Sequence, residues 1–125
     1  MKFLLAQINP VVGDLEGNAK KILHAASKAS SNSADLVLTP ELSLWGYPAN
    51  DLLLKKNLIK NQYQILDQLA LDIKKKYGSL SITVGIAEII NDSFFPNLYN
   101  SIASVSYTHL PSPRDTVTSR MPSSA

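Results

Sequence analysis

The sequence predicts an α/β protein of one domain. Its 125 residues and 13.6 kDa match the size of a single ordinary domain. Short apolar runs alternate with longer segments whose apolar residues recur every three or four positions. Such alternation of strand-like and helix-like segments is typical of α/β folds. The predicted order is strand, helix, strand, helix, strand, strand.

The first strand is predicted over residues 2–8, an apolar run that stops at Asn9-Pro10. A connection with two glycines follows, in which Asp14 or Asn18 is the candidate cap of a helix. The spacing i, i+3, i+4, i+7 marks the apolar stripe of this helix, which consists of Ile22, Ala25, Ala26 and Ala29.

The second strand is predicted over residues 34–39, where Pro40 halts it. Residues 40–50 contain two prolines, a glycine and the only tryptophan, so we expect an irregular loop. Asp51 is the candidate cap of a second helix that ends at Gly78. Its apolar stripe consists of Ile65, Leu66, Leu69, Ile73 and Tyr77. Two further strands, over 80–90 and 98–105, are close enough to form a hairpin.

Composition changes near residue 105. Residues 1–105 contain ten Lys and no Arg, whereas residues 106–125 contain two Arg and no Lys. Eleven of the last twenty residues are Ser, Thr or Pro, and they show neither a helix nor a strand period. The sequence therefore predicts two parts: a domain over residues 1–105 and a disordered tail over residues 106–125. The tail is either a natural linker stub or, as we prefer, non-native sequence.

Charge and cysteine content narrow the class of function. A net charge of +2 does not indicate a protein that binds nucleic acid or a membrane surface. No apolar run reaches the length of about 18 residues that a membrane span needs. The absence of cysteine excludes disulfides, Cys-ligated zinc and a thiol nucleophile within this chain.

Glu41 is the strongest candidate for catalysis. It follows the second predicted strand, and α/β folds place ligand-binding groups at the carboxyl ends of strands. Its neighbours Leu42, Leu44 and Trp45 are apolar, so partial burial would raise the pKa of its carboxyl group and suit it to general base catalysis. On the pattern alone, an exposed loop glutamate is an equal alternative.

Three other polar residues have weaker patterns. Tyr47 could line a pocket, although packing is the simpler interpretation. Glu88 is either a second pocket carboxylate or, as we favour, the residue at which a strand reaches the surface. His24, among alanines of the first helix, is interpreted as a surface or packing residue.

Four pieces of the first 105 residues resemble the carbon–nitrogen hydrolase (nitrilase) superfamily. They read AQINPVVGDLEGN, DLVLTPELSLWGYP, ITVGIAE and YNSIASV. Within the superfamily, the combination of INPVVGDLEGN with PELSLWGYPANDLLL is most similar to the amino-terminal glutaminase domain of glutamine-dependent NAD synthetases. The resemblance implies a nitrilase-type αββα sandwich of which this chain holds an incomplete part, in the order βαβαββ.

The resemblance also implies a mechanism. The superfamily uses a Glu-Lys-Cys triad, whose glutamate, the one in PEL, corresponds to Glu41 as general base. Tyr47, at the GY position, would stand at the wall of the glutamine pocket. The family's lysine and cysteine come later than the matching part, and this chain has no cysteine. We therefore expect the chain as written to have no glutaminase activity.

The expected function is that of a fragment of a glutamine-dependent NAD synthetase. Such a parent hydrolyses the amide of glutamine and supplies ammonia for the ATP-dependent amidation of deamido-NAD. We expect no cofactor in this chain, with ATP and Mg²⁺ belonging to the missing synthetase domain. The expected partner is the small molecule glutamine, without nucleic acid or membrane, and the expected parent is a cytoplasmic homo-oligomer.

Two alternatives remain. The nearest is a fragment of another carbon–nitrogen hydrolase, a ω-amidase or an aliphatic amidase. The other is a non-catalytic, small α/β binding module, which predicts a cooperative thermal unfolding transition. The fragment hypothesis predicts instead a poorly soluble or molten species, because half a sandwich leaves a sheet face uncovered.

Overall fold

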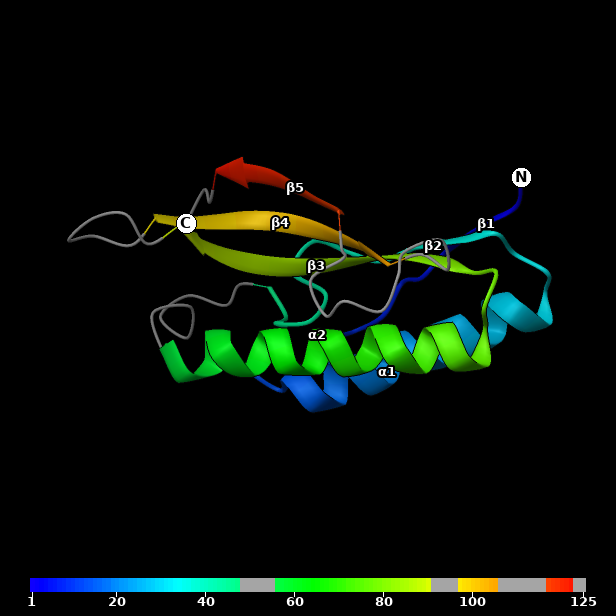
Figure 1. The fold of residues 1–125 in the computed structure, drawn as a ribbon, viewed down its shortest axis with the longest axis horizontal. Helices are drawn as coiled ribbons and strands as arrows, with labels where there is room; N and C mark the ends of the chain where they lie inside the picture. The colour runs from blue at the N-terminus through cyan, green and yellow to red at the C-terminus, as the bar shows by residue number, and fades with distance from the viewer. Residues whose placement is uncertain (48–55, 91–96, 106–116, 123–125) are drawn as a thin grey trace.

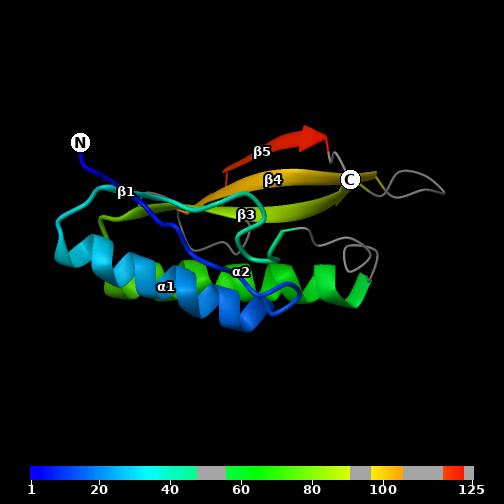
Figure 2. The ribbon, with the colours of Figure 1, turned by 180° about the vertical axis from the view of Figure 1, so that it is seen from behind.

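A single sheet with two helices on one of its faces makes up the fold. The computed structural model describes residues 1–47, 56–90, 97–105 and 117–122. Its elements are β1 (Phe3–Leu5), α1 (Leu15–Ser31), β2 (Leu36–Leu38), α2 (Lys56–Lys76), β3 (Ser81–Ile90), β4 (Asn97–Val105) and β5 (Val117–Pro122). Both helices lie below the sheet in Figure 1, and the view from behind in Figure 2 shows the same two layers. The predicted α/β class is confirmed.

The sheet has the order β1-β2-β3-β4-β5. β1, β2 and β3 are parallel, as expected for strands joined by helices. β3 and β4 are antiparallel in a register that runs from Ile82 opposite Val105 to Ile90 opposite Asn97. The predicted pairing of these two strands is therefore confirmed.

Of the two candidate caps of helix α1, the structure has the earlier one. Asp14 is the N-cap, and its side chain accepts a hydrogen bond of 3.0 Å from the N–H of Gly17. Asn18, the other candidate, lies inside the helix and is buried. The stripe Ile22, Ala25, Ala26 and Ala29 is buried as predicted.

Helix α2 contributes large aliphatic side chains to the core. Leu66, Leu69 and Ile73 of the predicted stripe are buried, and Ile65 and Tyr77 are partly buried against the same core. The three lysines of its last turn complement the helix dipole. The predicted cap Asp51 lies outside the described residues.

The first two strands are shorter than predicted. β1 and β2 pair over three residues each, where the sequence predicts strands over 2–8 and 34–39. Beyond Leu38 the chain leaves the ladder, and the hydroxyl of Thr39 donates to the carbonyl of Thr83 at 2.5 Å. The apolar pattern extends further than the pairing because flanking residues such as Ile8 and Ala34 pack against the core without joining the ladder.

The structure has a strand where the sequence predicts a disordered tail. β5 pairs antiparallel with β4, from Tyr99 opposite Pro122 to Ser104 opposite Val117. An edge strand needs backbone partners on one side only, and β4 supplies them regardless of the side-chain pattern. Pro122 ends an edge strand, a position that proline tolerates. The boundary at residue 105 and the non-native origin of the tail stay predictions.

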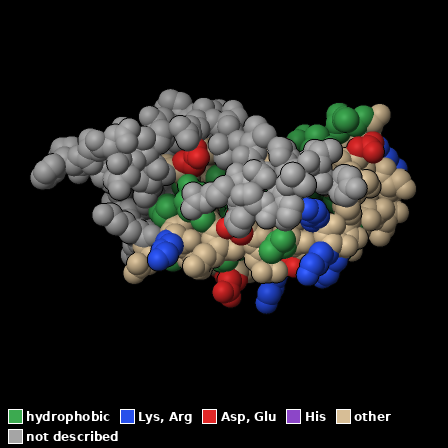
Figure 3. Space-filling view, in the orientation of Figure 1, with side chains coloured by type: hydrophobic (Ala, Val, Ile, Leu, Met, Phe, Trp, Pro, Cys, Tyr) green, Lys and Arg blue, Asp and Glu red, His purple; other side chains and the backbone are tan. Residues whose placement is uncertain are grey.

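The sheet face opposite the helices carries exposed apolar side chains. Paired residues share a face, so Phe3, Leu5 and Ile102 lie on the side away from the buried Val37 and Ile82. They are 57%, 70% and 39% exposed. Figure 3 shows hydrophobic side chains gathered on the surface at the N-terminal end of the molecule, over β1.

Candidate active site

The loop over residues 39–47, which follows β2, carries both site residues predicted from the sequence. Its middle residues are buried in the core, namely Leu42, Ser43, Leu44 and Trp45. Glu41 and Tyr47, on either side of this stretch, are exposed. The buried stretch thus anchors the loop and keeps Glu41 at the carboxyl end of a parallel strand.

Strand β3 binds the loop at the point where β2 no longer pairs with it. The N–H of Gly85 donates to Oγ of Ser43 at 2.9 Å, and the N–H of Leu44 donates to the carbonyl of Gly85 at 3.1 Å. Oγ of Ser43 also lies 2.8 Å from Oγ1 of Thr39 in a hydrogen bond. The buried Ser43 therefore satisfies a backbone group that β2 leaves without a partner.

Gly85 allows the loop to approach β3 closely. A Cβ at this position would lie 2.4 Å from the nitrogen of Leu42 and 2.7 Å from the carbonyl oxygen of Pro40. No side chain fits at such distances, so the backbone on both sides of Glu41 rests on a position that only glycine can fill.

The backbone of Leu42 is strained directly after Glu41. Its φ is 49°, in the left-handed region that costs a non-glycine residue about 1–3 kcal/mol. Two hydrogen bonds hold this conformation, since the N–H groups of Trp45 and Gly46 donate to the carbonyl of Leu42 at 2.9 and 2.8 Å. Strain of this kind clusters at functional sites, which supports the hypothesis that the position of Glu41 matters.

A buried glutamine joins the loop to α2 and β3. The carboxamide oxygen of Gln62 accepts from Nε1 of Trp45 and from the N–H of Ala87, the latter at 2.8 Å. Its Nε2 donates to the carbonyl of Ala87 at 2.7 Å. One side chain on α2 therefore pairs with both backbone groups of Ala87, as a neighbouring strand would, and fixes the indole.

A buried asparagine joins the loop to the segment that precedes α1. The carboxamide of Asn18 accepts from the N–H of Val11 at 2.8 Å and donates to the carbonyls of Val11 and Leu44, both at 2.9 Å. Gly46, with φ of +80°, lies so close to Val12 that a Cβ would be 2.9 Å from its backbone. These contacts fix the far end of the loop.

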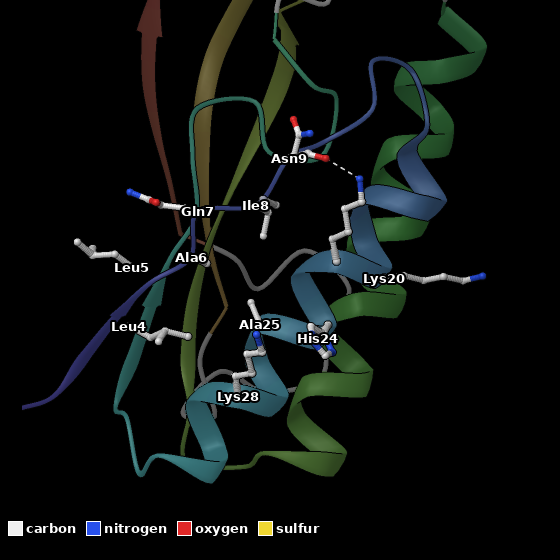
Figure 4. A pocket seen from close by; sticks show the side chains of 11 residues that line it. Leu4, Leu5, Ala6, Gln7, Ile8, Asn9, Lys20, His24, Ala25 and Lys28 are labelled. Atoms are coloured by element: carbon white, nitrogen blue, oxygen red, sulfur yellow. Dashed lines mark hydrogen bonds between the residues drawn. The ribbon is translucent and has the colours of Figure 1, made fainter.

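Glu41 and Tyr47 lie in the same loop, but neither is enclosed. Of the two alternatives for Glu41, partial burial is wrong and the exposed loop position is the one that the structure has, because Leu42 to Trp45 occupy the buried positions. Tyr47 is 62% exposed. Neither residue lines the cavity between residues 4–9 and α1 or the cavity between α1 and α2 (Figure 4). Their catalytic and substrate-binding roles stay predictions.

Glu88 and His24 lie elsewhere. Glu88 is half-buried on β3 and accepts a hydrogen bond of 3.0 Å from Oγ of Ser101 on β4. Alternation along β3 puts its side chain on the helix-covered face with Ile86, whereas Gly85 meets the loop on the other face. His24 is exposed on α1 and lines a cavity there.

The residues that hold the loop escaped the sequence analysis. Asn18, Ser43 and Gln62 are each 0% exposed. For Gln62 a signal exists, because it falls on the apolar stripe of α2 with Ile59 and Leu66. A polar residue in such a stripe predicts a buried hydrogen-bonding role. Ser43 and Asn18 carry no comparable signal.

The described part of the chain contains neither a metal-binding cluster nor a membrane span. No group of three His, Cys, Asp or Glu side chains is arranged there to hold a metal ion. Among the described helices, none is long and apolar enough to cross a bilayer.

Residues 5–106 match the family of carbon–nitrogen hydrolases, and the chain belongs to it. A glutamine-dependent NAD(+) synthetase of Acinetobacter baylyi is 36% identical over 106 residues, which cover 79% of this chain and 20% of the relative. The enzyme of the same name from Synechocystis is 46% identical over 81 residues, which cover 65% and 14%. The chain thus spans about a fifth or less of the length of these relatives.

Solved structures agree with the fold. The glutamine-dependent NAD+ synthetase of Acinetobacter baumannii superposes with a TM-score of 0.72 at 33% identity, covering 84% of this chain and 18% of that one. An amidase from Nesterenkonia superposes with a TM-score of 0.68 at 19% identity, covering 96% and 43%. The first supports the nitrilase-type fold together with the family, and the second the fold alone. This chain is a partial version of that fold.

Proposed function

We propose that this chain is the amino-terminal part of the glutaminase domain of a glutamine-dependent NAD synthetase. The observation that carries the proposal is the similarity to enzymes of that name, 36% identical across 79% of the chain. A match of this extent necessarily includes the loop over residues 39–47. The parent hydrolyses the amide of glutamine and uses the ammonia to amidate deamido-NAD.

Glu41 is the general base of this reaction. A cysteine from a later part of the domain gives its thiol proton to the carboxylate, and the thiolate attacks the amide carbon of glutamine. The C–N bond breaks, ammonia leaves with the proton that Glu41 returns, and water hydrolyses the thioester to glutamate. A lysine ammonium, also from a later part, stabilises the oxyanion. The anchored loop supports this role because it holds the carboxylate in place without reorganisation.

The remaining parts of the proposal concern the parent protein. Tyr47 stands at the wall of the glutamine pocket, and its exposed ring is available to a substrate. ATP and Mg²⁺ serve the synthetase domain, and this chain holds no cofactor. The parent is a cytoplasmic homo-oligomer that binds neither nucleic acid nor membranes. The 125-residue chain by itself is inactive because it has no cysteine.

A chimera tests the proposal. Residues 1–105 replace the corresponding segment of the Acinetobacter baylyi enzyme, and glutamate release and NAD formation are measured with glutamine or with ammonia as nitrogen source. We expect Glu41→Gln to lower glutamine-dependent turnover by about 100-fold or more, in the range that loss of a general base costs. NAD formation from ammonia should persist, since it bypasses the glutaminase site.

The matched control is Glu16→Gln. It removes an exposed carboxylate in the first turn of α1, outside the loop over residues 39–47. It should leave both activities unchanged. A chimera that folds and uses ammonia but releases no glutamate contradicts the proposed function. Equal turnover by the Glu41→Gln chimera contradicts the role of Glu41. Glutamate release by the pure 125-residue chain contradicts its proposed inactivity.

A further inference from the structure

Two hydroxyl groups close the turn that carries Glu41. Thr39 lies two residues before Glu41 and Ser43 two residues after it, and Oγ1 of Thr39 lies 2.8 Å from Oγ of Ser43. Both groups also bond to β3. The N–H of Gly85 donates to Oγ of Ser43 at 2.9 Å. Oγ1 of Thr39 donates to the carbonyl of Thr83 at 2.5 Å, so the two ends of the turn are joined to one another and to the same strand.

The direction of each of these hydrogen bonds follows from the number of protons. A hydroxyl group has one proton to donate, whereas a carbonyl oxygen can only accept. The proton of Thr39 goes to the carbonyl of Thr83, so in the bond between the two hydroxyl groups Ser43 is the donor. The bonds therefore form one directed chain, from the N–H of Gly85 through both hydroxyl groups to β3 again. In such a chain each bond polarises and strengthens the next.

The backbone between the two hydroxyl groups has little freedom. The ring of Pro40 fixes its φ near about −65°. Leu42 has a φ of 49°. The turn also rests on Gly85, where a Cβ would lie 2.7 Å from the nitrogen of Ser43. Packing of this kind limits the distance of the turn from β3, whereas the directional hydrogen bonds of the hydroxyl groups limit its sliding along the strand.

Ser43 can affect catalysis only through the backbone. Its side chain is 0% exposed, so its hydroxyl group cannot touch a substrate. It can determine where the chain places the carboxylate two residues away. A displacement of a reacting group by about 1 Å can cost about 100-fold in rate.

We propose that Thr39 and Ser43 are positioning residues, whose paired hydroxyl groups hold the carboxylate of Glu41 where it takes the thiol proton. The inference rests on the proposed function, in which Glu41 is the general base. The hydroxyl pair fixes the backbone on both sides of this residue before glutamine binds. Loss of either hydroxyl group slows the proton transfer and leaves the affinity for glutamine unchanged.

The test uses the chimera with the Acinetobacter baylyi enzyme. Ser43→Ala and Thr39→Val each remove one hydroxyl group and should lower kcat for glutamate release about tenfold, at an unchanged KM for glutamine. Thr39→Ser keeps the hydroxyl group and should retain most of the turnover. The variant with both Ser43→Ala and Thr39→Val should lose less than the product of the single losses, because the two residues belong to one hydrogen-bond chain.

Ser101→Ala is the matched control. It removes a hydroxyl group that is also 0% exposed, but this one donates to a carboxylate oxygen of Glu88 at 3.0 Å, between β4 and β3. It should leave kcat and KM close to those of the unchanged chimera. An equal loss of kcat for Ser101→Ala and Ser43→Ala overturns the special role of the turn.

The same changes combined with Glu41→Gln separate positioning from a structural role. Without the carboxylate there is no base to position, so Ser43→Ala should change the remaining turnover little. A structural role would lower the amount of folded domain, and hence the turnover, by the same factor with and without Glu41. Equal factors in the two backgrounds therefore overturn the proposal.

Two further outcomes distinguish this inference from the proposed function. Full turnover by Ser43→Ala and Thr39→Val, in a chimera that Glu41→Gln inactivates, overturns the positioning role and leaves the proposed function standing. A raised KM at unchanged kcat also overturns the positioning role, since it indicates a contact with glutamine. A chimera that makes NAD from ammonia but releases no glutamate before any of these changes overturns the proposed function and this inference with it.

Discussion

The two faces of the sheet differ in what lies against them. On the helix-covered face, Val37, Ile82, Val84 and Ile86 are all 0% exposed. The backbone groups of β3 that β2 leaves free are satisfied by the loop over residues 39–47, which meets Gly85 on the other face, and by Gln62 of α2. On the other face, Phe3, Leu5 and Ile102 are apolar and exposed.

Buried hydrogen bonds around the loop and exposed apolar side chains on the other face should respond differently to mutation. Around the loop, buried polar groups have partners, and among the described residues no buried side-chain nitrogen or oxygen lacks a hydrogen bond. Removing one of these partners leaves a buried donor or acceptor with neither a hydrogen bond nor water. This lowers the free energy of unfolding. On the other face, Phe3, Leu5 and Ile102 are in contact with water in any case, so changes at these residues should alter association rather than stability.

The largest loss of stability is expected for Gln62→Leu. Leucine keeps the approximate shape but leaves Nε1 of Trp45 and both backbone groups of Ala87 unpaired inside the core. With about 1–3 kcal/mol for each such group, partly relieved by relaxation, we expect a loss of about 4 kcal/mol. Urea unfolding followed by the fluorescence of Trp45 measures it. Gln64→Leu, at an exposed position of the same helix, is the control and should change little.

Gly85→Ala should cost somewhat less. The added methyl group would overlap the backbone of Pro40 and Leu42, and these atoms cannot rotate away. We expect a loss of about 3 kcal/mol, typical of severe overpacking. Gly78→Ala, in the turn before β3, is the matched control. If both variants unfold at the same urea concentration, the close approach of the loop to β3 does not exist.

Asn18→Ala should have a smaller effect than either. It removes three hydrogen bonds to Val11 and Leu44, but Val11 is 55% exposed, so water can replace part of what is lost. We expect about 2 kcal/mol. Asn32→Ala, which removes an exposed side-chain bond to the carbonyl of Lys28, is the comparison. A larger loss for Asn32→Ala would contradict the idea that burial sets the cost.

The sequence predicted the helix-covered face better than it predicted the loop over residues 39–47. Periodicity identified both helical stripes, because burial of a helix face imposes a spacing that single residues reveal. It placed Glu41 after β2 because the apolar run over residues 34–39 ends at Pro40. It left open whether Glu41 is buried or exposed, since this depends on the left-handed backbone of Leu42 and on the contact with Gly85. β5 was missed because its pairing rests on backbone groups of β4, which leave no side-chain pattern.

The smallest effect on stability, and the clearest contrast, is expected on the open face. Leu5→Ser combined with Ile102→Thr replaces two exposed apolar side chains by polar ones. Since both already face water, the free energy of unfolding should change by no more than about 0.5 kcal/mol per site. Self-association should fall, because the apolar patch that two molecules can bury together is smaller. Sedimentation velocity over a range of concentrations measures the association, and the binding of a hydrophobic dye measures the exposed patch. If the double variant instead unfolds as readily as Gln62→Leu, the face is covered in solution and the two faces are alike.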